Sequence, residues 1–165
     1  MKKVIFFLFI ITTTQAFSQV VSVDAFRREY QQCFKDSATC NKIYKKATKS
    51  TANDVLSNAY KGAITAAMAN HSKDKKEKLS LFNSGKKLLE QSIFTDTSNI
   101  ETRFLRFTIQ TNCPKALGYN KQINSDKAFI LKNYSSATNI AVKRMITSFA
   151  QQSTSFSETE KQKLK

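Results

Sequence analysis

The chain has 165 residues and a formal net charge of +15, and 41% of its residues are hydrophobic. This length suits one domain with its own core, and three glycines with one proline are too few for the turns of an all-β domain. The charge favours acidic partners, either an acidic protein or peptide or an anionic lipid or glycan surface, although a basic solvated surface also serves solubility alone.

Residues 1–18 have the pattern of a secretory signal peptide. Lys2 and Lys3 precede an apolar run over 4–11, and a polar stretch with small residues follows. The run is far shorter than the roughly 20 residues that span a bilayer, so we expect no transmembrane segment. We expect cleavage after Ser18 and an exported, periplasmic or extracellular protein. Export argues against nucleic acid as a partner.

Apolar residues recur about once per helical turn through most of the remaining chain. This period predicts helices over about 23–35, 38–49, 53–70, 75–94, 100–110, 123–135 and 137–152. We therefore expect an all-α fold of about seven helices, stacked as antiparallel hairpins in a single domain over 19–153. Capping boxes are predicted at 98–101 and 157–160. Because 154–165 carries few apolar side chains, we expect a frayed or disordered basic tail there.

Two of the three cysteines, Cys33 and Cys40, bracket the short break between the first two predicted helices. An oxidising compartment would permit a disulfide between them. Both also lie on apolar helix faces, where a free cysteine packs as a small hydrophobe. The sequence leaves these alternatives open, whereas Cys113 has no evident partner and is predicted to be a buried thiol.

The helix predicted over 100–110 has apolar residues on two sides, which places it at the centre of the array. Its remaining polar stripe, expected to face a groove, holds Arg103, Arg106 and Gln110. The planar guanidinium of arginine matches a carboxylate or phosphate, so two arginines one turn apart could clamp an acidic ligand. The alternative is that they pair with acids of neighbouring helices, such as Glu90 or Asp126. Asn112 would add hydrogen bonds and Tyr119 a stacking rim.

The stretch over 86–104 resembles a tetratricopeptide-repeat junction. Gly85, Leu89 and Ser92 match the small, large, small order of the second repeat helix, which ends in a polar turn. The chain is also similar, over about 60–130, to a group of small exported bacterial proteins. The matching stretches are 60–63, 70–71, 85–90, 103–106, 117–120 and 126–130. These resemblances imply a helical fold and export, and they imply no activity.

The sequence favours an exported, non-enzymatic binding protein with a helical groove for an acidic peptide or partner. A cationic surface protein that holds anionic lipid or glycan through its lysines is the first alternative, and an unrecognised small hydrolase is the second. His71 is the single histidine and lies in a polar link, where we expect it to be solvated. We expect no metal site and no cofactor.

Overall fold

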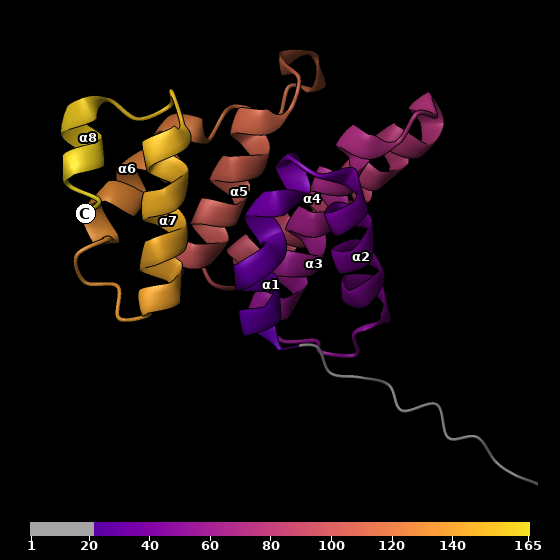
Figure 1. Ribbon diagram of the computed structural model, residues 1–165, viewed down its shortest axis with the longest axis horizontal. Coiled ribbons are helices and arrows are strands. Elements are labelled where there is room, and N and C mark those ends of the chain that lie inside the picture. The colour runs from indigo at the N-terminus through magenta and orange to yellow at the C-terminus, as the bar shows by residue number, and fades with distance from the viewer. Residues whose placement is uncertain (1–21) are drawn as a thin grey trace, which may run out of the picture.

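The computed structural model describes residues 22–165 and contains eight α-helices, with no strand in that range (Figure 1). The all-α fold expected from the apolar period is confirmed. The predicted signal peptide lies outside the described residues. Within residues 22–165, no helix combines the length and the apolar character that crossing a membrane would require.

The first half of the described chain forms four helices. They are α1 (Val23–Glu29), continued by the 3-10 helix η1 (Tyr30–Phe34), α2 (Ser37–Lys49), α3 (Val55–Met68), continued by the 3-10 helix η2 (Ala69–His71), and α4 (Lys75–Thr95). An aspartate precedes each of the last three, and its side chain accepts hydrogen bonds from backbone N–H groups of the first turn: Asp36, Asp54 and Asp74. These caps satisfy amides that have no partner within the helix, so they fix where each helix begins.

The second half forms four further helices. They are α5 (Ile100–Asn112), followed by the 3-10 helix η3 (Lys115–Leu117), α6 (Ile123–Asn133), α7 (Ile140–Gln152) and α8 (Glu158–Gln162). The capping box predicted at 98–101 is wrong, because Asn99 caps α5 while the Ser98 hydroxyl donates to Asp96. The capping box predicted at 157–160 is present and begins α8.

Helices α3 and α4 form a hairpin whose backbones touch. A Cβ placed on Gly85 would lie 2.4 Å from the Ala66 nitrogen and 2.5 Å from the Gly62 carbonyl oxygen. A Cβ on Gly62 would lie 2.7 Å from the Gly85 carbonyl oxygen. Only glycine permits this approach at either position, which explains two helix-disfavouring residues inside otherwise regular helices.

Helix α5 lies at the centre of the molecule, between the group α1–α4 and the group α6–α8 (Figure 1). Its apolar side chains point in both directions, as the two apolar sides of the sequence predict. Phe104 and Phe107 each make an edge contact with the Phe149 ring of α7, while Leu105 and Ile109 are also buried. The core is therefore one continuous set of side chains built around α5.

The C-terminal segment packs onto the domain, which corrects the expected frayed or disordered tail over 154–165. Phe156 is buried with its ring against Phe107, and Leu164 has no exposed surface. The Thr147 hydroxyl of α7 donates to the Leu164 carbonyl over 2.5 Å. Although the segment has few apolar residues, these two are buried, and Glu160 of α8 forms an ion pair with Lys127 of α6 over 3.0 Å.

Candidate functional site

The predicted arginine stripe is covered by neighbouring helices. Arg106 forms two parallel hydrogen bonds to Asp126 of α6, from Nε to Oδ2 and from Nη2 to Oδ1, both of 2.7 Å. Its Nη1 donates to Glu90 of α4 over 2.9 Å. Arg103 donates from Nη1 to the same Asp126 over 3.0 Å. The pairing that the sequence left as an alternative is therefore present, and the stripe does not face an open groove.

We call Glu90, Arg103, Arg106, Tyr119 and Asp126 the polar cluster. Asp126 has no exposed surface, and Arg106 is 5% exposed. Burial opposes the charge of Arg106, but its hydrogen bonds to Asp126 and the charges of Asp126 and Glu90 outweigh burial and raise its pKa. The two positive and two negative charges of the cluster compensate each other, as buried charges must. A ligand-binding role for these arginines stays a prediction.

Two other predicted site residues are also buried beside the polar cluster. Tyr119 donates from Oη to Glu90 Oε1 over 2.5 Å, and its ring meets the edge of Phe82, so it forms no open rim. Burial raises the pKa of Tyr119, and the hydrogen bond to Glu90 adds to the rise. Gln110 donates to Gln122 over 3.0 Å, and its own Oε1 has no partner in the described part of the chain.

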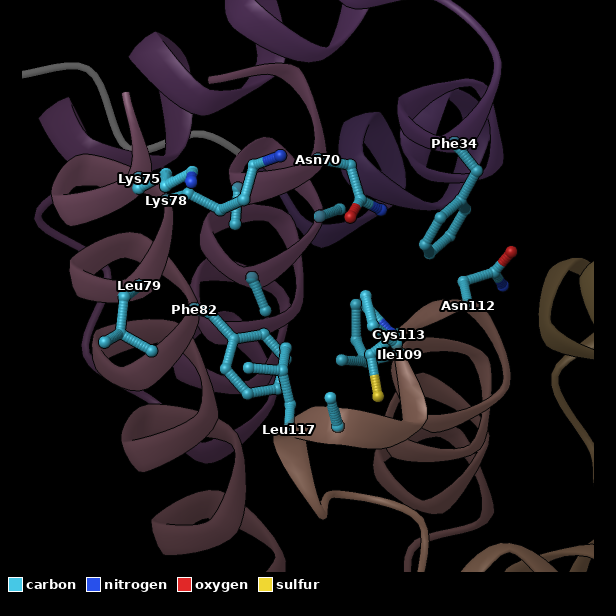
Figure 2. Close-up of a pocket in the computed structure, with 15 residues that line it drawn as sticks. Phe34, Asn70, Lys75, Lys78, Leu79, Phe82, Ile109, Asn112, Cys113 and Leu117 are labelled. Atoms are coloured by element: carbon cyan, nitrogen blue, oxygen red, sulfur yellow. The ribbon is translucent and has the colours of Figure 1, made fainter. Parts of the chain in front are cut away.

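Asn112, the remaining predicted residue, lies away from the polar cluster and lines a cavity of about 330 Å³ at the end of α5 (Figure 2). The walls are mainly apolar and come from five parts of the chain: Phe34, Ala66, Phe82, Ile109, Pro114 and Leu117. Ligand pockets of proteins have volumes from about 300 Å³ upward and are lined largely by apolar side chains. The cavity has both properties.

The mouth of this cavity combines exposed apolar and basic side chains. Leu79 of α4 is 50% exposed and Leu117 of η3 is 37% exposed, so both offer apolar surface at the mouth. Lys75 and Lys78 lie on the same face of α4, one turn apart, and Figure 2 shows them beside Leu79. Within residues 22–165 the ammonium group of neither lysine has an ion pair or a hydrogen bond, so both charges are available to a ligand.

A second, more polar hollow of about 380 Å³ adjoins the first. Phe34 and Asn112 line both, so these two side chains form the wall between them. Gln31, Lys35 and Gln152 supply polar groups on the far side of that wall. A mainly apolar hollow and a more polar one therefore lie on either side of Phe34 and Asn112.

His71 is half-buried rather than fully solvated. Its Nε2 lies 2.7 Å from the carbonyl oxygen of Cys33 and so ties η2 to η1. No group of three or more histidine, cysteine or acidic side chains in the described range is placed to hold a metal ion.

Of the residues that line the cavity, only Asn112 was predicted from the sequence as a site residue. Its walls come from segments far apart in the chain, and periodicity assigns the apolar ones to the core. One signal was readable: Lys75, Lys78, Leu79 and Phe82 have helical spacing and put two lysines beside two apolar residues on one face. Comparison with known protein families, curated proteins and solved structures finds no match for the chain.

Proposed function

We propose that the protein is an exported, non-enzymatic binding protein that receives an apolar group of an acidic peptide or partner protein in the cavity at the end of α5. One observation carries the proposal: an apolar cavity opens between two exposed apolar residues and two lysines without partners. The acidic partner is the one that the sequence favours. The contact surface, however, is the face of α4 rather than the arginine stripe, whose guanidinium groups already have carboxylate partners.

Size and polarity select the kind of group that enters the cavity. The volume suits one or two side chains of a partner rather than a helix. Burying a leucine- or phenylalanine-sized group contributes about 1.5–3 kcal/mol. Phe82 and Ile109 lie in its wall, so such a group would meet buried apolar carbon. The anchor is therefore an apolar side chain, which leaves the acidic groups of the partner outside the cavity.

The lysines fix where those acidic groups lie. Lys75 and Lys78 are exposed and stand at the mouth on the α4 side. An exposed ion pair contributes at most about 1 kcal/mol, so these lysines orient a partner more than they hold it. A peptide with an acidic residue next to its apolar anchor satisfies both features at once.

The first test uses 1-anilinonaphthalene-8-sulfonate, which joins apolar rings to one anionic group, as a fluorescent probe of the cavity. We expect saturable binding of one probe per chain. The double change Lys75→Glu and Lys78→Glu should weaken binding about fivefold or more. The matched control changes the exposed Lys45 and Lys49 of α2 to glutamate, which alters net charge equally and should leave binding unchanged.

The apolar part is tested separately. Leu79→Ser at the mouth should weaken binding of the probe. Ile140→Ser, which alters an exposed apolar residue of α7, should leave binding unchanged. A synthetic peptide with one leucine among acidic residues should displace the probe. Absence of saturable binding would refute the proposal. Equal weakening by both lysine pairs would instead favour the cationic-surface alternative, in which charge alone holds the partner.

A further inference from the structure

The structure brings two cysteines together in the core. Cys33 of η1 and Cys40 of α2 have no exposed surface, and the structure holds both as free thiols. Residues 35–36 connect the two elements, and η1 packs against α2. We propose that Cys33 and Cys40 form a disulfide bond in the exported protein. The proposal rests on export and is independent of the cavity.

Separate contacts hold the two cysteines in place. The carbonyl of Cys33 lies 2.7 Å from His71 Nε2, which fixes the end of η1 against η2. The amide of Cys40 donates to the Asp36 carbonyl over 3.0 Å, and the Asp36 side chain caps α2. Because these bonds do not involve sulfur, they hold η1 and the start of α2 in place whether or not the thiols are joined. A disulfide needs this kind of proximity, since it cannot bridge distant cysteines without moving the backbone.

The bond forms by thiol–disulfide exchange, in which the thiolate is the reactive form of cysteine. In the folded domain the contact with Cys33 lowers the pKa of Cys40, and the same contact together with burial raises the pKa of Cys33. Before folding buries them, either cysteine can react first. When Cys40 does so, its thiolate attacks the disulfide of a thiol oxidoreductase of the oxidising compartment, which forms a mixed disulfide and releases one oxidoreductase thiolate.

Cys33 then loses its proton to solvent and attacks the Cys40 sulfur. The bond between Cys40 and the oxidoreductase breaks and the second oxidoreductase thiolate leaves. The chain loses two protons and two electrons, and the oxidoreductase disulfide becomes a dithiol. Since both cysteines are buried in the folded domain, this exchange belongs to the stage before η1 packs on α2.

The third cysteine takes no part. The Cys113 sulfur contacts the carbonyl oxygens of Gln110 and Tyr119 and lines the cavity at the end of α5. The proposal therefore predicts one free thiol in each chain and identifies it as Cys113.

The test is peptide mapping of the full chain, expressed with residues 1–18 and exported to an oxidising periplasm. Free thiols are alkylated under denaturing, non-reducing conditions before digestion with trypsin. Because Lys35 separates the cysteines, trypsin yields peptides 29–35 and 36–42. We expect these two peptides to be linked, lighter than their sum by two hydrogen atoms, with alkylation at Cys113 alone. Alkylation of all three cysteines in an exported chain would overturn the proposal.

Stability provides a second readout. A reductant should lower the thermal unfolding midpoint of the exported chain by about 5–10 °C. The double variant Cys33→Ser and Cys40→Ser should not respond to reductant, while Cys113→Ser should respond like the parent chain. A parent chain that does not respond to reductant and yields no linked peptides refutes the bond.

Failure of export is recognised independently, because the tryptic peptide 4–27, which spans the expected cleavage site after Ser18, is then recovered intact. In that event the purified chain is unfolded, reduced and refolded with glutathione disulfide as the oxidant. Linked peptides 29–35 and 36–42 in the refolded chain support the pairing. Their absence under these conditions overturns it even though export itself has failed.

Discussion

Asp126 is the residue on which the polar cluster depends. It has no exposed surface and accepts three hydrogen bonds, one from Arg103 and two from Arg106. Replacing it by asparagine removes the negative charge and leaves a buried guanidinium without its main partner. We expect Asp126→Asn to lower the free energy of unfolding by about 3–5 kcal/mol. Urea unfolding followed by circular dichroism measures this loss.

The control for this prediction is an exposed ion pair on the same molecule. Lys161 and Glu158 lie one turn apart on α8, and the Glu158 side chain is 83% exposed. Glu158→Gln removes one negative charge, as Asp126→Asn does, but this charge is exposed to solvent. We expect a change within about 0.5 kcal/mol. Similar losses for the two variants would show that the polar cluster is not a structural ion pair.

The sequence predicted which polar residues of the central helix lie together, but it left their interaction partners open. The spacing of Arg103, Arg106 and Gln110 showed that they share a stripe of one helix. Spacing cannot show which helix covers the stripe, because that depends on the path of α6. The acids weighed as partners, Glu90 and Asp126, are the ones that the structure places there.

The contact between α3 and α4 leads to a prediction about these two elements. A Cβ at Gly85 would meet backbone atoms of α3, which cannot rotate away as a side-chain end can. We expect Gly85→Ala to destabilise the protein by about 2 kcal/mol or more, even though alanine favours the helix by up to about 1 kcal/mol. Thermal unfolding measures the shift. Ser84→Ala, on the exposed side of α4, should be neutral or slightly stabilising, and equal effects at both positions would contradict the close crossing.

The apolar period predicted the helices because most of them bury one face. It did not predict their ends, which depend on competition between neighbouring caps. Ser98 and Asn99 are both good N-caps in isolation. The structure selects Asn99, because Ser98 donates to Asp96 and Glu101 receives hydrogen bonds from Arg27 and Tyr60 instead of reaching back. Contacts from distant helices thus decide a local feature.

At the scale of the whole molecule, the cavity could not be predicted from the sequence, because its walls come from segments far apart in the chain. The cavity walls combine Phe34 with α4 and with the turn after α5. In the sequence, each apolar residue of the wall is predicted to be part of the core. The cavity between them exists only in the folded arrangement. The packed C-terminal segment has the same origin. Phe156 and Leu164 do not belong to a helical pattern of apolar residues. In the folded chain, however, Phe156 packs against Phe107 of α5, and the Leu164 carbonyl accepts a hydrogen bond from Thr147 of α7.

Acid should destabilise the whole molecule through its helix caps. Hydrogen bonds from Thr39 lower the pKa of Asp36, and hydrogen bonds from Ser57 lower the pKa of Asp54. Because these values are lowered in the folded state, the stabilisation is present above the ordinary aspartate pKa of about 4 and is lost as pH falls through the folded value. Loss of negative charge also increases repulsion in a chain that already carries +15.

We therefore expect a thermal unfolding midpoint that is flat from about pH 7 to pH 5 and falls steeply below about pH 4. The double variant Asp36→Asn and Asp54→Asn separates caps from general repulsion, because asparagine accepts the same amide hydrogen bonds without titrating. It should lose less of its midpoint between neutral and acid pH than the parent chain does. Circular dichroism melts across this range measure both. If the two chains lose equal amounts, the acid sensitivity comes from net charge, and the caps do not contribute to it.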